Sequence, residues 1–322
     1  MSKEKGDKDM LNNNISAKMR KKMIARSKRA RFMNIVRNPF IVVSFLFLLI
    51  EAASIIYALV WSTFSSLKSI TDFTENMFGA PKVLHVVNYI KIYRHLSYDV
   101  WVSGGGIETY DFMKLLVNSV LYAVFPPAVT VFSMMAVAYA TSKYNFKASK
   151  VLDTIVLIVV IFPGVNSLGQ NIQFLRRIGF YNHYWALLLG NIAFADYNYL
   201  IWKGIFKGIS NDFIDAAKVD GAGHYHIFFS IVIPLIRAPL MIFYVLGFIG
   251  MWNNYNIPLY TIPSMPNLAL VLHQLRDNTI NEIAWPMYQL AGAMIVAIPC
   301  IIVYVFIEPL MGGDLLAGGI KG

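Results

Sequence analysis

Charged residues are scarce in this sequence. Asp, Glu, Lys and Arg together make up 14% of its 322 residues, whereas a water-soluble domain carries roughly 25%. Apolar residues make up 57%, the mean hydropathy is +0.54, and the apolar residues gather in long blocks. Several blocks reach the roughly 20 residues that a helix needs to cross a bilayer. The composition therefore excludes a water-soluble domain and predicts a polytopic membrane protein.

Sites of chemistry are also missing. The single cysteine, Cys300, excludes a disulfide within the chain, and its place in an apolar block predicts an inert thiol. The sequence has no Gly-x4-Gly-Lys-Ser/Thr phosphate loop, no nucleophile paired with a base, and no metal-binding cluster beside His224 and His226. We therefore expect that this chain is not an enzyme and binds no cofactor or metal.

Positive charge is concentrated at the N-terminus. Residues 1–37 hold twelve Lys and Arg against three acidic residues, a net of +9 out of +10 for the chain. Beside an apolar block, such a tail indicates a cytoplasmic flank or adhesion to anionic lipid headgroups, rather than nucleic acid. The basic stretch is long and the next apolar run has full spanning length, so we expect no cleavable signal peptide.

The apolar blocks predict an all-α fold with six transmembrane helices, because a barrel strand would need only about 9–11 alternating residues. The fourth block is interrupted by Asn191, Asp196 and Asn198. The predicted spans are about 39–61, 113–140, 151–172, 184–207, 227–251 and 286–310. They form one transmembrane domain, 39–310, between an N-terminal tail, 1–38, and a C-terminal tail, 311–322.

The distribution of Lys and Arg predicts that both termini face the cytoplasm. With the basic tail inside, the connection after the second span is also inside, and it carries Lys143, Lys147 and Lys150. Arg176 and Arg177 on the outside are a mild exception. The segment 208–226 is then cytoplasmic, and the outer segments are 62–112, 173–183 and 252–285, of which the two longest are expected to fold and to meet a soluble partner.

The cytoplasmic segment 208–226 has the features of a short helix with a defined end. Asp212 is expected to cap it, with Asp215 three residues on. Small side chains at Ala216 and Ala217 keep the helix narrow enough for another protein to approach. Gly221 permits a turn that a residue with a side chain resists. Pro234 follows where the next helix is expected to enter the membrane.

The spacing Asp215-Ala216-Ala217-x3-Gly221-x9-Ile231-x-Ile233-Pro234 resembles the EAA motif of permease subunits of ATP-binding cassette (ABC) importers, Glu-Ala-Ala-x3-Gly-x9-Ile-x-Leu-Pro. From about residue 39 onward the chain is similar to the six-span permease partner of maltose-type carbohydrate importers. Further matching pieces are the run TFSSLKS at 63–69, Phe78-Gly79-Ala80-Pro81, Asn88-Tyr89, Asn118-Ser119, Phe162-Pro163-Gly164 and the Gly/Lys-rich end Ala317–Gly322.

The resemblance implies a type I ABC importer permease fold, with a second permease subunit, two ATPase subunits that bind ATP and Mg²⁺, and an extracytoplasmic solute-binding protein as partners. It implies that 208–226 is a coupling segment, in which the residues around Asp215–Gly221 form the coupling helix and Asp215 faces a basic residue of an ATPase. It also implies that 252–285 touches the solute-binding protein. The implied coupling residues are Asp215, Ala216, Ala217, Asp220, Gly221, Ala222 and Pro234, and the residues implied near the ATPase interface are Gly318, Gly319 and Lys321.

Four polar residues inside apolar blocks are candidates for lining the transport pathway: Glu51, Asn191, Asp196 and Asn198. A charged group at mid-bilayer costs roughly 2.5–3.5 kcal/mol on insertion scales, so it is expected to face protein or water. Hydroxyl-rich solutes need such hydrogen-bonding groups. For Glu51, a lining role and a protonated contact between helices both stay open.

The expected function is thus coupling of ATPase motion to carbohydrate import, with an oligosaccharide as the cargo that the resemblance implies. A non-sugar ABC importer is the alternative within the class. An ion-coupled secondary transporter, which would use intramembrane groups such as Glu51 and Asp196, and a membrane receptor or scaffold are the alternatives outside it. A receptor or scaffold function would leave the sequence pattern of 215–234 unexplained.

Overall fold

The computed structural model describes residues 38–102, 104–144, 146–161, 168–192, 195–277 and 284–312, with side chains up to Leu310. The predicted tails, apart from Asn38 and residues 311–312, and the Phe162-Pro163-Gly164 piece lie outside them. The chain divides into two units, which are described separately: Met1–Phe64 with Phe78–Ala80, and Ser65–Met77 with Pro81–Gly322. The described residues are mostly helical.

Helix α2 (Pro39–Ser66) makes up most of the described part of the first unit. Its 28 residues give a length of about 42 Å, more than the roughly 30 Å of a bilayer core. It is apolar around its whole circumference, and none of its best spanning window is buried. Glu51 lies on this helix with an exposed side chain. The exposed apolar surface means that α2 needs lipid or another protein around it.

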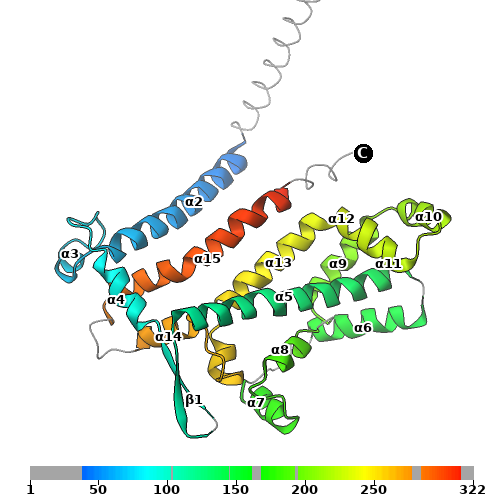
Figure 1. Ribbon diagram of the computed structural model, residues 1–322. Helices are drawn as coiled ribbons and strands as arrows, with labels where there is room; N and C mark the ends of the chain where they lie inside the picture. Colours follow the sequence, from blue (N-terminus) through cyan, green and yellow to red (C-terminus); the bar gives the residue numbers. More distant parts are fainter. Residues whose placement is uncertain are drawn as a thin grey trace, which may run out of the picture. The chain divides into compact units, whose positions relative to one another are not determined.

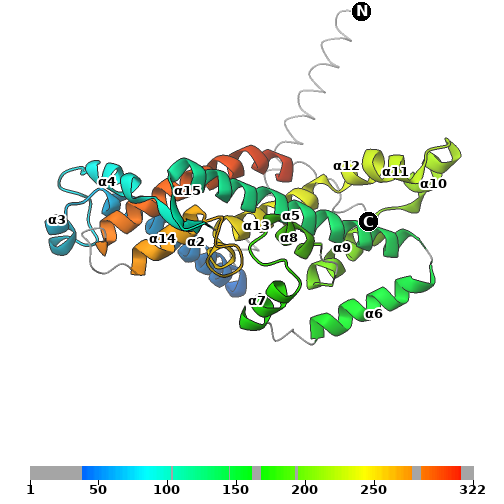
Figure 2. The same ribbon diagram turned by 60° about the horizontal axis from the view of Figure 1, so that its bottom comes forward.

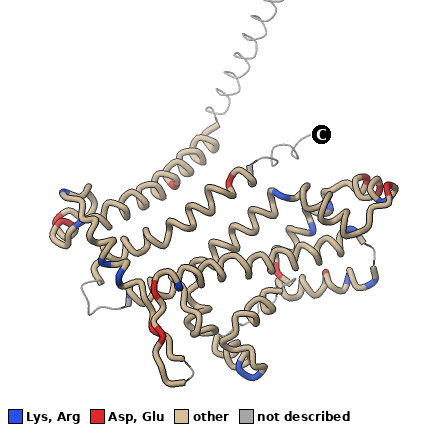
Figure 3. Tube along the Cα trace, viewed as in Figure 1, with Lys and Arg blue, Asp and Glu red and all other residues tan. Residues whose placement is uncertain are grey.

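Three long helices lie side by side in the second unit: α5 (Phe112–Lys143), α13 (Arg237–Trp252) and α15 (Pro286–Gly312) (Figures 1 and 2). Asp111 caps α5 by accepting from the Lys114 amide at 3.0 Å. Figure 3 shows that these helices bear almost no charge along their lengths, while Lys, Arg, Asp and Glu gather at ends and loops. This distribution matches a bilayer environment for the helices.

The described residues contain three helices that are long and apolar enough to span a membrane: α2, α5 and α15 over Pro286–Leu310. The segment His224–Leu235 and helix α13 make a fourth if the two, bent by 80°, are counted as one span. In the region of the third and fourth predicted spans, the described residues form α6 (Lys147–Ile161), α7 (Leu168–Arg177), α8 (Tyr184–Gly190) and α9 (Tyr197–Gly208), none of which has the length of a span by itself. The count of six spans therefore stays a prediction.

The fourth predicted span, 184–207, is broken where its polar residues lie. Asn191 is the C-cap of α8, and Asp196 is the N-cap of α9. Asn and Asp compete with the helical backbone for hydrogen bonds, so they favour helix ends over helix interiors. The polar residues that interrupt the apolar block thus lie where one helix ends and the next begins.

The bend before α13 follows from a local change of helix type. Helix α11 (His224–His226) continues as the π-helix η1 (Ile227–Val232) and the short α12 (Ile233–Leu235). Pro234 has no amide hydrogen to give to a helical ladder, and Ile236, with φ −107° and ψ 16°, leaves helical geometry. The predicted span 227–251 is therefore bent close to Pro234, which precedes the bend rather than beginning a straight helix.

A β-hairpin contradicts the all-α expectation for the outer segment 62–112. Strands β1 (Tyr98–Val102) and β2 (Gly106–Tyr110) pair antiparallel, with Trp101 opposite Ile107. The tip uses Gly104 and Gly105 at φ +137° and +89°, values that residues with side chains rarely adopt. The strands are short, and the three consecutive glycines by themselves indicate only a folded surface.

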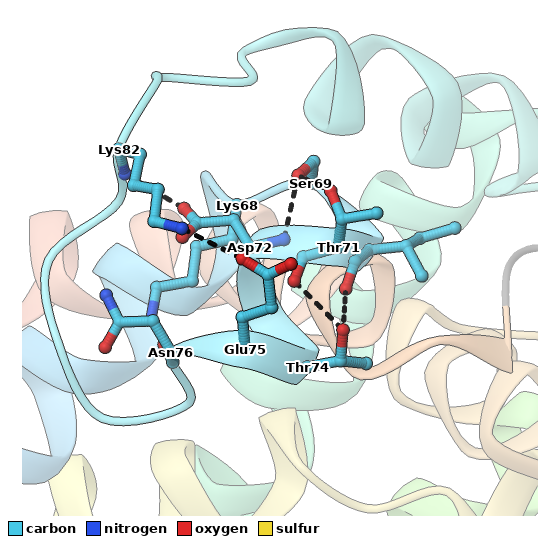
Figure 4. A network of polar contacts seen from close by, with 9 residues as sticks. Lys68, Ser69, Thr71, Asp72, Thr74, Glu75, Asn76 and Lys82 are labelled. Carbon is cyan, nitrogen blue, oxygen red and sulfur yellow. Dashed lines mark hydrogen bonds and ion pairs between the residues drawn. The ribbon is translucent and has the colours of Figure 1, made fainter.

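The rest of this outer segment is held by a buried lysine (Figure 4). Lys68 is fully buried, and its Nζ donates to the carbonyl oxygens of Asn76 and Met77 at 2.5 and 3.2 Å, just after α3 (Ile70–Glu75). Ser69 caps α3 by accepting from the Asp72 amide. Asn88, on α4 (Val87–His95), donates to the Lys68 carbonyl at 2.9 Å. The segment is therefore folded, as predicted.

The outer segments 173–183 and 252–285, which the sequence places on one side of the membrane, contact each other. Asn182 donates its amide to the Thr261 carbonyl, at the end of π-helix η2 (Ile257–Thr261), and its Oδ1 accepts from the Ser264 amide, each at 2.9 Å. Farther along, Asn118 of α5 donates to the Pro266 carbonyl at 2.8 Å, just before α14 (Leu268–Asp277). The segment after α13 is therefore fixed to the end of α5.

Candidate functional site

A short helix forms inside the predicted cytoplasmic segment: α10 (Asn211–Val219). Its cap is Ser210, whose Oγ accepts from the Asp212 amide at 3.2 Å, so the prediction that Asp212 is the cap is wrong. Asp212 lies in the first turn, and its carboxylate accepts from Ser210 Oγ at 2.8 Å. A hydroxyl reaches the free amides directly, whereas the carboxylate stabilises the positive end of the helix dipole.

The turn predicted at Gly221 is present and ends α10. Gly221 has φ +80°, and its amide donates to the Lys218 carbonyl at 3.0 Å. The next amide, that of Ala222, reaches back to the Ala217 carbonyl at 2.9 Å. These two bonds form a Schellman motif, in which a left-handed residue closes the helix and satisfies its last carbonyls.

The two faces of α10 differ in burial. Ile214 and Ala217 are buried in a cluster that includes Phe206 and Ile227. On the other face, Phe213, Ala216 and Val219 follow at intervals of three, and Phe213 and Val219 are 56% and 88% exposed. The helix therefore packs one side on this chain and leaves an apolar face, defined by those three residues, uncovered within the described part of the chain.

The polar candidates of the motif are at the surface. Asp215 is exposed and forms an ion pair with Lys218 at 3.0 Å. Asp220 and Pro234 are exposed, and Ala222 is half-buried against the cluster beneath α10. An exposed i, i+3 ion pair contributes little to stability, so Asp215 can exchange Lys218 for another cationic partner at small cost.

Both ends of the coupling segment are bonded to the C-terminal end of α5. Lys143 Nζ donates to the Ile209 carbonyl at 2.6 Å and to Asn211 Oδ1 at 2.9 Å, just before and at the start of α10. Tyr144 OH lies 2.9 Å from His224 Nδ1, just after the turn. Figures 1 and 2 show α10 and α11 beyond this end of α5, with α3, α4 and α14 at the opposite end.

A polar network joins α5, α6 and α9 near the same end. Asp153 pairs with Lys203 and accepts from Tyr199 OH at 2.7 Å, and Tyr199 OH is 2.6 Å from Thr141 Oγ1. The Lys203 side chain is 14% exposed, so its charge is largely removed from solvent. This network fixes three helices to one another next to the coupling segment.

A cavity of about 470 Å³ lies among α5, the end of α8, α9 and α13. That volume falls within the range of small-molecule sites, roughly 300–1,000 Å³. Its lining residues are Pro127, Thr130, Val131, Met134, Asn191, Tyr197, Asn198, Trp202, Phe243, Leu246, Gly247, Gly250, Met251 and Asn254.

Two of the four predicted pathway residues, Asn191 and Asn198, line this cavity. Asp196 is not among the lining residues, but its Oδ2 accepts from Asn198 Nδ2 at 3.1 Å. Glu51 lies on α2, in the other unit, and its role stays a prediction, as do the roles of Gly318, Gly319 and Lys321, which lie outside the described residues. Sequence reasoning missed Thr130, whose hydroxyl donates to Asn191 at 3.1 Å.

Comparison with known proteins places this arrangement in a family. Residues 133–310, more than half of the chain, match the family described as binding-protein-dependent transport system inner membrane component. The chain is 25% identical over 294 residues to the galactooligosaccharides transport system permease protein GanQ of Bacillus subtilis, covering 90% of this chain and 99% of that protein. It is 29% identical over 212 residues to the maltodextrin transport system permease protein MalD of Streptococcus pneumoniae, covering 64% and 74%.

A solved structure has the same fold. The crystal structure of a bacterial ABC transporter involved in the import of the acidic polysaccharide alginate contains a chain that superposes with a TM-score of 0.66 at 23% identity, covering 84% of this chain and 95% of that one. The described residues thus have the fold of an ABC importer permease.

The chain belongs to the family of inner membrane components of binding-protein-dependent transport systems. It is a permease subunit of an ABC importer: a multi-pass membrane protein and a transport component rather than an enzyme. Membership implies that it works with further subunits.

Proposed function

We propose that this chain forms half of the translocation pathway for a carbohydrate, most simply an oligosaccharide, and couples ATPase motion to alternating access. The names of relatives such as the galactooligosaccharide and maltodextrin permeases support the cargo class. The observation on which the coupling role rests is α10, a helix with the EAA-like spacing, a defined end at Gly221 and an uncovered apolar face.

In this proposal, the face of Phe213, Ala216 and Val219 seats on an ATPase subunit in the cytoplasm. Burying such side chains stabilises a complex by about 25 cal/mol per Å² of apolar surface, and the exposed small side chain of Ala216 lets the partner approach the backbone. Asp215 gives up Lys218 for a basic residue of the ATPase. Movement of the ATPase then shifts α10 and, through Lys143 and Tyr144, the end of α5.

The complete importer in this proposal contains a second permease subunit, two ATPase subunits that hold ATP and Mg²⁺, and an extracytoplasmic solute-binding protein. Both termini face the cytoplasm, so the tail with Gly318, Gly319 and Lys321 lies on the ATPase side. The outer segment 252–285, fixed to α5 through Asn118, contacts the solute-binding protein. The chain itself spans the membrane six times, over 39–310.

The test is a bulky substitution on the exposed face of α10. Ala216→Trp is expected to reduce co-purification of the ATPase subunits and uptake, while leaving the permease in the membrane. Ala148→Trp, at an exposed alanine of α6, is the matched control and is expected to change neither. Equal ATPase recovery from both variants would contradict the coupling role.

The charge at position 215 provides a second test. Asp215→Lys places a positive charge beside Lys218 and in front of the expected basic partner, so it is expected to weaken ATPase recovery more than Asp215→Asn does. If both variants retain full ATPase recovery and uptake, Asp215 is not part of the docking contact. Uptake that persists with no ATPase in the membrane would instead indicate an ion-coupled transporter.

A further inference from the structure

The cavity among α5, α8, α9 and α13 is polar but uncharged. Five of its lining residues bear polar side chains: Thr130, Asn191, Tyr197, Asn198 and Asn254. None of the described lining residues is Lys, Arg, His, Asp or Glu. In a low-dielectric site, hydrogen bonds must replace those that a solute loses on leaving water. The lining offers such bonds without offering a countercharge for an ionised solute.

The two amides of the fourth predicted span keep hydrogen-bonding capacity. An asparagine side chain has two N–H donors and two acceptor lone pairs. Asn191 donates to the Leu187 carbonyl at 2.8 Å and accepts from Thr130, which uses one donor and one lone pair. Asn198 donates to Asp196 at 3.1 Å. Each amide can therefore still give and receive a hydrogen bond, which is the pairing that a hydroxyl group requires.

An aromatic wall completes the cavity. Phe243 and Tyr197 line the cavity, and the ring of Phe243 packs on the fully buried Trp202 with ring centroids 4.9 Å apart. Aromatic rings provide a large apolar surface with few rotatable bonds. A sugar ring has apolar faces and hydroxyl groups around its edge. It therefore matches a site that combines aromatic side chains with amides.

An acidic group bonded to a lining residue makes the cavity unfavourable for anions. Asp196 accepts a hydrogen bond from the lining residue Asn198 at 3.1 Å, and its carboxylate repels a second negative charge with an energy that falls as the inverse of distance. No cation among the described lining residues offsets that repulsion. A uronic acid residue would therefore meet repulsion at the place where a neutral sugar finds an amide.

Two glycines of α13 have different surroundings. A Cβ on Gly247 would lie 2.9 Å from Pro127 Cβ, so this glycine lets α13 and α5 approach closely. A Cβ on Gly250 would meet no heavy atom within 4 Å, and Gly250 lines the cavity. The absence of a side chain at Gly247 thus allows α13 to pack against α5, whereas the absence of a side chain at Gly250 leaves room for a bound solute.

We propose that this cavity is a solute-contact site on this subunit, that it accepts an uncharged, hydroxyl-rich segment of the cargo, and that Gly250 sets its width. The site rests on the proposed carbohydrate function and narrows it to neutral saccharides. Asn191 and Asn198 give the hydrogen bonds, Tyr197 and Phe243 give the apolar wall, and Asp196 disfavours acidic sugars.

The experiment uses cysteine labelling in the assembled importer, purified in lipid nanodiscs. Leu246→Cys, at an exposed lining residue of α13, is introduced after Cys300→Ala has removed the native thiol, and it does not narrow the cavity. Modification rates are measured with cationic aminoethyl, neutral hydroxyethyl and anionic sulfonatoethyl methanethiosulfonates. They are measured alone and with a panel of neutral trisaccharides of glucose, galactose or arabinose, or with uronic acid trisaccharides. Gly204→Cys, at an exposed glycine of α9 that is not among the lining residues, is the control.

The expected result has two parts. In the Leu246→Cys variant the cationic reagent reacts faster than the anionic one by about tenfold, as a nearby carboxylate predicts, and Asp196→Asn removes most of that difference. Neutral trisaccharides slow the labelling of this variant in a saturable manner and uronic acid trisaccharides do not, while labelling of the Gly204→Cys control is unaffected by either. Protection by the uronic acids, or by neither class, would overturn the proposal, and so would a charge preference that survives Asp196→Asn.

Failure of this site is distinguishable from failure of the proposed function. ATP hydrolysis stimulated by the solute-binding protein is measured on the same samples. If it persists in the Leu246→Cys complex while no saccharide protects the thiol, the importer is intact and the contact site is wrong. If no stimulation occurs even in the parent complex, whereas saccharides protect the thiol, the site stands and the ATPase coupling is at fault.

Discussion

The end of α10 provides the sharpest quantitative test of the coupling segment. Gly221 has φ +80°, whereas Gly223, two residues on, has an ordinary φ of −72°. At both positions a Cβ would meet no heavy atom within 4 Å. Gly221→Ala and Gly223→Ala therefore add the same methyl group to equally open space, and they differ only in backbone conformation.

The expected cost at position 221 follows from that conformation. A residue with a side chain in the left-handed region is disfavoured by roughly 1–2 kcal/mol, and replacing glycine by alanine recovers about 0.4–1 kcal/mol because the unfolded chain has fewer conformations. The net cost is about 1 kcal/mol, which is about a fivefold change in an equilibrium constant. Avoiding the strain by opening the turn would break the bonds of Gly221 and Ala222, at about 0.5–1.5 kcal/mol each, so it saves little.

The assay is titration of purified ATPase subunits onto membranes that contain each variant, together with solute uptake. Gly221→Ala is expected to weaken ATPase binding by at most about fivefold, because the strained turn opens in part of the free permease and must close again on docking. Gly221→Asn is expected to weaken binding less because asparagine tolerates the left-handed region, and Gly223→Ala to leave it unchanged. If Gly221→Ala and Gly223→Ala behave alike, the Schellman turn is not what positions the docking face, and the reasoning is refuted.

Three further predictions concern packing and buried charge. Gly247→Ala pushes α13 away from Pro127 and is expected to lower the thermal unfolding temperature in detergent, since overpacking costs about 1–3 kcal/mol; Gly250→Ala is the control and should not lower it. Lys203→Met leaves its carboxylate partner unpaired and should also lower that temperature; unchanged unfolding would mean that the ion pair does not hold α6 to α9. Lys68→Met strips two carbonyl oxygens of their donor, at about 1–3 kcal/mol, so the outer segment should be cleaved faster by added protease, and an unchanged cleavage rate would contradict the role of this buried ammonium.

The sequence predicted the elements whose signal is local and strong. The long apolar blocks at 39–61, 113–140 and 286–310 correspond to α2, α5 and α15, because length and hydropathy alone define such helices. The hairpin was missed, although Tyr98–Val102 and three glycines give the alternation and turn that predict one. The strand signal covers only a few residues, and it was weaker than the long apolar blocks that favoured an all-α fold.

The boundaries inside the third to fifth predicted spans are not encoded in hydropathy. The 80° bend near Pro234 follows from the change of helix type at η1 and from the departure of Ile236 from helical geometry. For the coupling segment, spacing predicted the helix and its glycine turn. The cap was misassigned because α10 begins at Asn211, so Ser210 rather than Asp212 is the residue just before its first turn.

The cavity itself was not predicted, although two of its lining residues, Asn191 and Asn198, were among the four candidates for lining the pathway. Asn191 and Asn198 were recognisable because amides are rare in apolar blocks, whereas Thr130, Trp202 and Gly250 look like ordinary residues of membrane helices. Their common cavity comes from the close approach of α13 to α5 at Gly247. A contact between residues so far apart along the chain has no local signature, so it could not be read from sequence alone.

The attachment of the coupling segment to Lys143 at one end and to Tyr144 at the other has a mechanical consequence. A segment bonded to a helix at one point can rotate about that point without moving the helix. A segment bonded at two neighbouring points must move the helix with it. Removing either contact, by Lys143→Met or Tyr144→Phe, should therefore leave ATP hydrolysis intact but uncouple it from movement of the transmembrane helices.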